Sequence, residues 1–254
     1  MKEFLFQLKK RLIALLDIWQ KRIRRPFVNK GLTEERSYSV PIIINNRNRL
    51  THMLRLITWL EKNGYKNIYI LDNDSTYPPL LEYYKNSPHH IIFLKKNVGY
   101  LALWRTNIFD LFKNDYYVYT DPDVVPNDNC PKDLVFQLYK VLKSNFSIEK
   151  CGAALKIDDL PSYYKNKEAV IADEKKHWEH KVSDTVYDAP VDSTFALYRP
   201  LAWGRAEDCK AYRLSGKYDF HHLPWYEDSA NQTEEDKYYI SHVSKGSTMW
   251  TEKN

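Results

Sequence analysis

Cysteine is scarce in this chain of 254 residues, which contains only Cys130, Cys151 and Cys209. They form no C-x-x-C pair and no cluster with histidine, which excludes the usual zinc modules. An odd and sparse set also argues against a disulfide framework and for a reducing compartment. Glycine is scarce as well, with seven residues beside twelve prolines, and this composition excludes a low-complexity chain.

Long apolar runs are also missing. None approaches the roughly 20 residues that a membrane-spanning helix needs, and the Lys9-Lys10-Arg11 cluster interrupts any secretory leader. The net charge is +5, and residues 1–25 alone contain eight basic and two acidic side chains. The remaining chain is therefore nearly neutral, so no nucleic-acid partner is expected.

Residues 1–25 have the pattern of an amphipathic helix. Apolar side chains recur every three or four residues in one stripe, at Phe4, Leu8, Leu12, Leu15, Trp19 and Ile23. A basic helix of this kind suits an anionic lipid surface, which would place a cytoplasmic protein peripherally on the inner face of the cell membrane. The stripe could equally pack on the chain's own domain or on a second subunit. Residues 26–37 are expected to form a polar linker, because Pro26 ends the helix.

The rest of the chain, residues 38–254, alternates short apolar runs with amphipathic segments. Strands are expected at 40–44, 67–71, 91–94 and 116–120, and helices at 50–62, 79–86 and 100–112. This alternation predicts one α/β domain with a mostly parallel, twisted sheet flanked by helices. Farther along, the pattern indicates a helix at 131–144, strands at 151–157 and 193–199, a polar excursion at 160–190, an irregular loop at 221–228 and a helix at 233–243.

Two carboxylates stand at the end of the fourth predicted strand, in Thr120-Asp121-Pro122-Asp123. Successive side chains of an extended chain alternate between faces, so Asp121 and Asp123 point the same way. They repel each other unless a cation lies between them, and such oxygen ligands suit Mg²⁺ or Mn²⁺. Taken alone, Asp-Pro-Asp would also suit an ordinary turn.

Polar motifs follow the neighbouring strands as well, at the edge where parallel sheets bind ligands. The second strand leads into Asp72-Asn73-Asp74-Ser75, the third into Asn97-Val98-Gly99, and the next helix carries Arg105-Thr106-Asn107. With Asp121-Pro122-Asp123, this ordered set resembles the nucleotide-diphospho-sugar glycosyltransferases of the Rossmann-like GT-A fold, especially their family 2 group. Each motif is weak alone, and the resemblance covers residues 38 to about 200.

The resemblance implies a donor site. Its donor-binding positions map to Asp72, Ser75, Asn97, Gly99, Arg105 and Asp121. Asp72 would contact the base, and the Arg105 guanidinium would approach base or phosphate. Asp123, with Asp121, would hold Mn²⁺ or Mg²⁺, which would stabilise the charge of the leaving nucleotide diphosphate. Taken singly, Asp72 would suit a turn and Arg105 a surface ion pair.

The resemblance also implies a base for the acceptor hydroxyl. The family's acid pair maps to Glu227-Asp228, where Asp228 is predicted to be the general base of an inverting transfer and Glu227 to orient acceptor or loop. His242, with Lys245 and Gly246 behind it, supports a rival, since some GT-A enzymes, including retaining ones, use a late histidine as a third metal ligand. A late histidine can also be purely structural.

The function implied is transfer of a sugar, from a UDP-sugar in the first place, to a saccharide or lipid-linked glycan in surface polysaccharide synthesis. A nucleotidyltransferase of related fold would need a glycine-rich phosphate loop after the first strand, and residues 38–60 contain no glycine. A catalytically inactive glycan- or membrane-binding module would not require Asp72, Arg105, Asp121 and Asp123, although an enzyme that has lost its activity would keep them.

Overall fold

The computed structural model describes residues 8, 12, 15, 16, 19, 23–192, 194–204, 209–228 and 230–243. Most of the predicted helix over residues 1–25 therefore lies outside the described residues. The segment predicted as a linker contains two short helices, α2 (Arg25–Val28) and α3 (Glu34–Ser37), of which the second is capped by the Thr33 side chain. Within the described residues, no helix is long and apolar enough to cross a membrane.

A nine-stranded sheet forms the centre of the described chain, in the order β3-β2-β1-β4-β9-β6-β10-β8-β7. The strands are β1 (Ile42–Asn46), β2 (Ile68–Asp72), β3 (His90–Phe93), β4 (Tyr117–Thr120), β6 (Lys150–Ala153), β7 (Lys181–Ser183), β8 (Val186–Asp188), β9 (Ala196–Tyr198) and β10 (Ala211–Leu214). The pairings from β3 to β4 are parallel, and in the whole sheet only β9 and β8 run against the other strands. The predicted α/β class with a mostly parallel sheet is thus confirmed.

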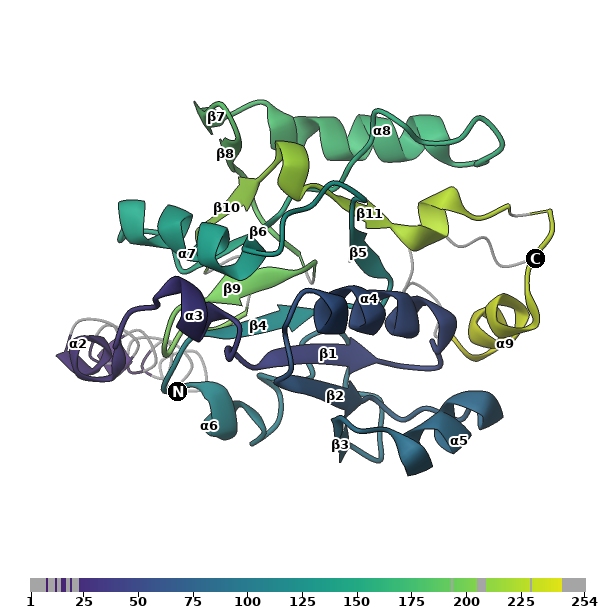
Figure 1. The fold of residues 1–254 in the computed structure, drawn as a ribbon, viewed down its shortest axis with the longest axis horizontal. Coiled ribbons are helices and arrows are strands. Elements are labelled where there is room, and N and C mark those ends of the chain that lie inside the picture. Colours follow the sequence, from purple (N-terminus) through teal and green to yellow (C-terminus); the bar gives the residue numbers. More distant parts are fainter. Residues whose placement is uncertain are drawn as a thin grey trace.

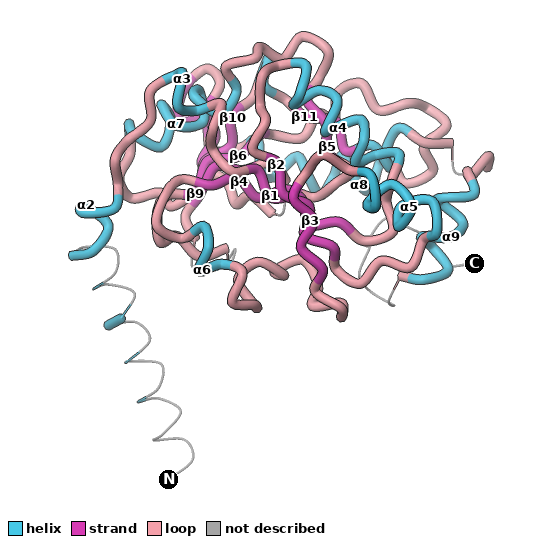
Figure 2. The backbone as a smooth tube through the Cα atoms, turned by 60° about the horizontal axis from the view of Figure 1, so that its bottom comes forward, coloured by secondary structure: helices cyan, strands magenta, loops and turns pink. Residues whose placement is uncertain are grey.

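Helices cover both faces of this sheet (Figure 2). α4 (Thr51–Lys62) and α7 (Leu134–Ser144) bury their apolar sides in the larger core on one face, while α6 (Phe109–Phe112) packs against tyrosines of β4 and β9 on the other. Ile42 and Ile44 belong to the first core and Ile43 to the second. This alternation is the two-residue period of a strand buried on both faces, which explains why β1 reads as an unbroken apolar run.

Further elements flank the strands of the large sheet. A small antiparallel sheet joins β5 (Val124–Pro126) to β11 (Phe220–His222), and the 3₁₀ turn η4 (Leu223–Tyr226) follows it. Figure 1 shows α5 (Pro78–Asn86) and α9 (Glu234–His242) on the side toward which the arrowheads of β1 and β2 point. The predicted excursion at 160–190 contains α8 (Lys167–Lys175), η2 (Lys176–Trp178), β7 and β8.

The helix predicted over residues 100–112 is the clearest difference from the sequence expectation. Only Phe109–Phe112 is helical, and residues 101–108 form turns. The four residues from Leu101 to Trp104 are all buried, with exposed fractions of 9% or less. A surface helix buries one face rather than four residues in succession. The segment instead enters the core, where the Trp104 indole donates a hydrogen bond of 3.0 Å to the Tyr117 hydroxyl.

Candidate active site

The carboxyl ends of β2, β1 and β4 meet at one edge of the sheet. β1 lies between the other two strands, with Asn46 opposite Asp72 and Ile44 opposite Thr120. Asp72 ends β2, and Asp121 and Asp123 come directly after β4. Strand pairing therefore brings the two acidic motifs to the same edge, on either side of β1. Parallel α/β sheets bind their ligands beyond this edge.

Asp72 is buried, with an exposed fraction of 3%, and is held at the start of its turn. Its carboxylate accepts hydrogen bonds from the Ser75 amide (3.2 Å) and the Tyr84 hydroxyl (3.3 Å). Burial raises the pKa of Asp72, although these hydrogen bonds act against it. The Ser75 hydroxyl accepts a hydrogen bond of 3.0 Å from the Asn48 amide. The turn is therefore fixed to the end of β1 by its own side chains.

Asn73 ties this turn to the second motif. Its side-chain oxygen accepts a hydrogen bond from the Val98 amide (2.8 Å), and its side-chain nitrogen donates to the Gly99 carbonyl (3.0 Å). Asn97 closes the same loop by accepting from the Gly99 amide (2.9 Å), and Arg105 donates to the Val98 carbonyl (2.9 Å). Gly99 has a φ of +81°, which favours glycine. Hydrogen bonds thus connect the two stretches of chain that contain the predicted donor residues Asp72, Ser75, Asn97, Gly99 and Arg105.

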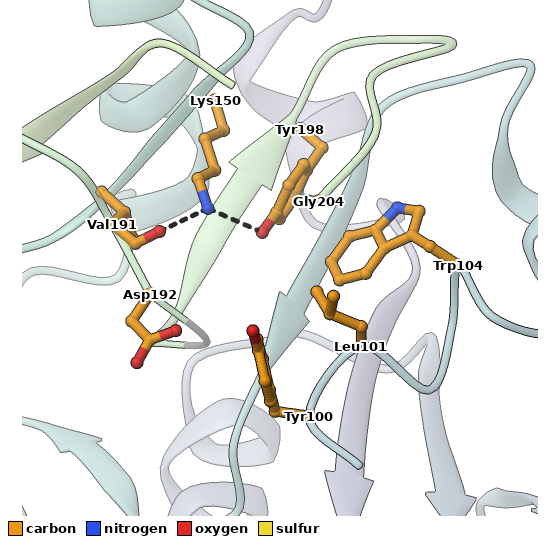
Figure 3. A pocket seen from close by; sticks show the side chains of 8 residues that line it. All are labelled: Tyr100, Leu101, Trp104, Lys150, Val191, Asp192, Tyr198 and Gly204. Atoms are coloured by element: carbon orange, nitrogen blue, oxygen red, sulfur yellow. Dashed lines mark hydrogen bonds between the residues drawn. The ribbon is translucent and has the colours of Figure 1, made fainter. Parts of the chain in front are cut away.

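A small cavity, shown in Figure 3, lies beside the residues that directly follow Gly99 in the chain. Its walls are formed by Tyr100, Leu101, Trp104, Lys150, Val191, Asp192, Tyr198 and Gly204. The buried Lys150 ammonium group donates to the Val191 carbonyl and to the Tyr198 hydroxyl, and burial lowers the pKa of Lys150. Tyr119 donates a hydrogen bond of 2.7 Å to the Tyr100 carbonyl. That bond links the cavity to the strand that precedes the Asp pair.

A histidine that sequence reasoning did not assign to the site lies beside Asp123. The His222 Nε2 atom is 3.8 Å from Asp123 Oδ2, and the Leu223 amide donates to the Asp123 carbonyl at 2.8 Å. Burial lowers the pKa of His222, while the Asp123 carboxylate acts in the opposite direction. Carboxylate oxygens and a neutral imidazole both offer lone pairs to a divalent cation, so the residues present fit Mn²⁺ or Mg²⁺. The pairing of β11 with β5, which places His222 here, has no signal in the sequence.

The two acids of the predicted pair, Glu227 and Asp228, have different surroundings. Glu227 contacts the buried His52 on α4, with Oε1 2.5 Å from Nε2. Asp228 instead remains within its own loop, where it accepts hydrogen bonds from the Asn231 side chain (2.6 Å) and the Ala230 amide (2.9 Å). These two bonds lower the pKa of Asp228. Its assignment as the general base stays a prediction.

Helix α9 docks on the residues that follow β1. Glu235 accepts hydrogen bonds of 3.0 to 3.1 Å from the Leu50 and Thr51 amides and thereby caps α4. Asp236 forms a buried ion pair with Arg49, whose Nη1 lies 2.6 Å from Oδ1. Sequence reasoning missed this contact surface, because each partner taken alone reads as an ordinary surface charge.

The same helix carries Tyr239 and His242. Burial raises the pKa of Tyr239 to about 12, and the charges of Asp123 and Asp121 act in the same direction. His242 is exposed; its Nδ1 lies 2.8 Å from the Tyr238 carbonyl, and its ring stacks on Tyr238 with centroids 4.0 Å apart. Among the described residues, Asp121, Asp123 and His242 do not form a group whose ligand atoms all lie within 4.8 Å. His242 as a metal ligand stays a prediction.

The solved structures to which the chain is similar include glycosyltransferases of the GT-A fold. One is GalNAc-T7 with UDP, GalNAc and Mn²⁺, at a TM-score of 0.46 and 11% identity over 72% of this chain and 43% of that chain. A second is S. aureus TarS 1–349, at a TM-score of 0.42 and 14% identity over 73% of this chain and 60% of that one.

A third similar structure is glucosyl-3-phosphoglycerate synthase from Mycobacterium tuberculosis, in complex with Mn²⁺, UDP and glucosyl-3-phosphoglycerate. The TM-score is 0.42 and the identity 14%, over 67% of this chain and 62% of that one. The chain thus spans less than two thirds of the length of each of these three proteins. No protein-family model matches the chain, and no curated protein matches its sequence.

Proposed function

We propose that this chain is a metal-dependent glycosyltransferase. It would move a sugar from a nucleotide-diphosphate donor, with UDP-sugars as the first candidates, to a saccharide or lipid-linked glycan acceptor in surface polysaccharide synthesis. The observation that carries the proposal is the assembly of three separate motifs at one sheet edge, with Asn73 bonded to both Val98 and Gly99. If Asp72 only formed a turn and Arg105 only formed a surface ion pair, the motifs would not need to lie together.

The residues around Asp123 support the metal requirement. Asp121 and Asp123 would hold the ion, and His222 lies close enough to Asp123 to contribute. A bound divalent ion would stabilise the negative charge that develops on the departing diphosphate. Asp72 and Ser75 support recognition of the nucleoside, because hydrogen bonds hold their turn, which lies on the other side of β1.

A thermal-shift screen tests the proposal first. UDP-, GDP- and dTDP-sugars are added with Mn²⁺, with Mg²⁺ or with a chelator, and a donor at one hundred times its Kd should stabilise the fold by about 2.7 kcal/mol. The expected result is a rise in melting temperature that needs both nucleotide and metal. If no nucleotide raises the melting temperature, the proposed donor site is wrong. Binding without hydrolysis or transfer of the sugar would favour the catalytically inactive glycan- or membrane-binding module.

The stereochemical course separates two versions of the enzyme. A single displacement assisted by a carboxylate base inverts the anomeric centre, and the carboxylates of the 227–228 loop favour this course. The alternative is a retaining enzyme that uses His242 as a metal ligand. The anomeric coupling constant of the product, measured by NMR from a donor of known configuration, decides between them. A retained configuration would remove the carboxylate base from the mechanism.

We further propose that residues 1–25 bind an anionic membrane, which would place the enzyme in the cytoplasm on the inner face of the cell membrane. Several described side chains of the apolar stripe are exposed, with fractions of 52% for Leu12, 61% for Leu15 and 55% for Ile23. Each basic side chain near such a surface is worth about 1 kcal/mol, and salt weakens the attraction.

Liposome sedimentation tests this membrane proposal with the full chain and a shortened one. The shortened chain should begin at Arg24, because Arg25 donates to the buried Glu149 carboxylate at 3.0 and 2.5 Å, and a later start would remove this buried ion pair. The full chain should sediment with vesicles that contain phosphatidylserine, less so at high salt, and the shortened chain should not. Equal binding by both would indicate a packing or subunit contact instead.

A further inference from the structure

Glu227 is held at the site by a buried histidine from another part of the chain. His52, on the first turn of α4, has an exposed fraction of 4%, and its Nε2 atom lies 2.5 Å from Glu227 Oε1. Since a carboxylate only accepts hydrogen bonds, Nε2 must carry the hydrogen in this contact. The Glu227 side chain is 37% exposed, so it is partly accessible from solvent. One carboxylate oxygen is thus fixed by His52 on a side chain that is not enclosed.

Asp228 lacks this arrangement. Its two oxygens accept hydrogen bonds from the Ala230 amide and the Asn231 side chain, both within three residues of it. Both oxygens of Asp228 are thus engaged within its own loop. The contacts are those of a local turn, whereas Glu227 is bonded across 175 positions of sequence. Of the two acids, Glu227 is therefore the one that the fold positions.

The turn η4 connects Glu227 to the residues around Asp123, the predicted metal ligand. At its start, the Leu223 amide donates to the Asp123 carbonyl at 2.8 Å. Trp225 is 3% exposed and packs against the His222 ring, with centroids 4.7 Å apart. The chain from Leu223 to Glu227 is thus anchored on Asp123 at one end and on His52 at the other. Glu227 is consequently tied to the segment that contains the predicted metal ligand.

The same residues raise the question of a second metal centre. Ligand atoms of His52, Glu227 and Asp236 all lie within 4.8 Å of one another. However, Asp236 already forms an ion pair with Arg49, 2.6 Å away, and accepts two hydrogen bonds from Thr233. A guanidinium at this distance repels a second cation, and the carboxylate has little remaining acceptor capacity. The geometry therefore favours a hydrogen-bonded His52–Glu227 pair over a metal site.

We propose that Glu227 is the general base and that His52 is its positioning residue. This inference rests on the proposed glycosyltransferase function. In the reaction, Glu227 Oε2 takes the proton of the acceptor hydroxyl while His52 Nε2–H holds Oε1. The hydroxyl oxygen forms a bond to the anomeric carbon, and the bond from that carbon to the diphosphate oxygen breaks. The nucleoside diphosphate leaves with the electron pair, and the proton remains on Glu227.

Four variants of the full-length protein test the inference: Glu227→Gln, Asp228→Asn, His52→Ala and His52→Gln. The assay is the Mn²⁺-dependent hydrolysis of UDP-glucose and UDP-N-acetylglucosamine, in which water serves as acceptor, and the affinity for UDP with Mn²⁺ is measured by calorimetry. Glu227→Gln keeps the shape and the contact with His52 but loses the base, so turnover should fall by roughly 10²–10⁴ with UDP affinity retained. Asp228→Asn should change turnover by less than about tenfold.

The two His52 variants separate positioning from packing. Glutamine keeps a side-chain N–H donor, whereas alanine removes it, so His52→Gln should retain more turnover than His52→Ala at equal UDP affinity. The matched control is Glu61→Gln, which alters the other histidine–glutamate contact of α4, where His89 Nε2 lies 3.4 Å from Glu61 Oε1. This control should keep parental turnover.

The outcomes distinguish the inference from the function on which it rests. A parental protein that neither binds UDP with Mn²⁺ nor hydrolyses either donor contradicts the function itself. An active parental protein with an equally active Glu227→Gln variant contradicts only the inference, and a large loss in Asp228→Asn then identifies Asp228 as the base. Equal turnover of His52→Gln and His52→Ala, both folded by circular dichroism, would remove His52 from its positioning role. Tight Mn²⁺ binding that needs His52 and Asp236 but not Asp123 would indicate the second metal centre instead.

Discussion

The Asn73 side chain donates a hydrogen bond of 3.0 Å to the carbonyl oxygen of Gly99, 26 residues away in the sequence. The same side chain accepts from the neighbouring Val98 amide at 2.8 Å. Each residue belongs to a loop at the end of a different strand, and neither loop has a helix or strand of its own to hold its shape. One carboxamide therefore sets the separation of the two predicted donor-binding segments.

Asn73→Ala should lower both donor affinity and stability. It removes two hydrogen bonds and leaves the Val98 amide without its side-chain partner, which costs about 1–3 kcal/mol when such a group is buried. The matched control is Asn67→Ala, which removes a single bond from an exposed side chain to the Ser39 carbonyl. Chemical denaturation and calorimetry with a UDP-sugar measure the two effects. If both variants bind the donor equally well, Asn73 does not set the geometry of the site.

Asp123→Ala should abolish metal-dependent donor binding without unfolding the protein. Its side chain is 17% exposed, and its one ion-pair contact among the described residues is the His222 ring at 3.8 Å. Little folding free energy therefore depends on this carboxylate, whereas the predicted ion does. Asp128→Ala, at an exposed position just beyond β5, is the control. Calorimetry of UDP with and without Mn²⁺ checks the result, and parental Mn²⁺ dependence in Asp123→Ala would refute the metal assignment.

Asp219 should make the protein less stable as the pH rises from about 4 to about 7. Burial raises the pKa of Asp219 to about 7, although Lys156 acts against it, and its Oδ1 has no hydrogen-bond partner in the described structure. An aspartate in an unfolded chain has a pKa of about 3.9. The folded protein thus binds this proton more tightly, and the contribution of Asp219 to stability is lost between about pH 4 and 7.

The variant Asp219→Asn should therefore melt at a higher temperature than the parental protein at pH 8, with the difference vanishing near pH 4. Asp188→Asn, which changes an exposed carboxylate on β8, is the control. Thermal unfolding at several pH values between 4 and 8 provides the comparison. Parallel pH curves for the parental protein and Asp219→Asn would contradict the expectation.

The Arg49–Asp236 pair should contribute strongly to stability. Burial pushes the pKa of Asp236 up, but hydrogen bonds from Thr233 and Arg49 outweigh burial and lower it. A lowered pKa in the folded state gives stability that is present above about pH 4 and is lost as the pH falls through the folded pKa. Asp236→Ala leaves the buried Arg49 guanidinium uncompensated, which should cost about 3–5 kcal/mol at pH 7.

The control for this pair is Glu234→Ala on the same helix. Glu234 is exposed, and among the described residues its ion-pair partner is Lys237, so its loss should cost less than about 1 kcal/mol. Urea unfolding at pH 7 and at pH 3 measures both variants. A cost for Asp236→Ala that is equal at the two pH values would show that packing, and not the ionised carboxylate, stabilises the docking of α9.

The sequence predicted those parts of the fold in which a signal lies within a few residues. The apolar runs before Asp72 and Asp121 identified β2 and β4, and their alternation with helices identified the parallel half of the sheet. The strands β5, β7, β8, β10 and β11 were missed, because strands of three or four residues carry too little periodicity. The helix predicted across residues 101–108 was wrong, since the four residues from Leu101 to Trp104 are buried in succession, whereas a surface helix buries residues along one face.

In the candidate site, too, local motifs could be predicted from the sequence and long-range contacts could not. The turn from Asp72 to Ser75 and the loop at Gly99 are local motifs, and the structure brings them together. The contacts of His52 with Glu227 and of Arg49 with Asp236 join residues that are 175 and 187 positions apart. No spacing rule links such pairs, because their proximity is created by the fold itself.

The cap of α4 has a consequence for how the protein matures. The first amides of this helix, at Leu50 and Thr51, are satisfied by Glu235, 185 and 184 positions later in the chain. During synthesis, at about 5–20 residues per second, the sheet core can begin to form long before Glu235 leaves the ribosome. The nascent chain therefore passes through a stage in which its scaffold exists but the residues after β1 are still uncapped. Competence to bind a ligand at this edge would be acquired only when α9 arrives.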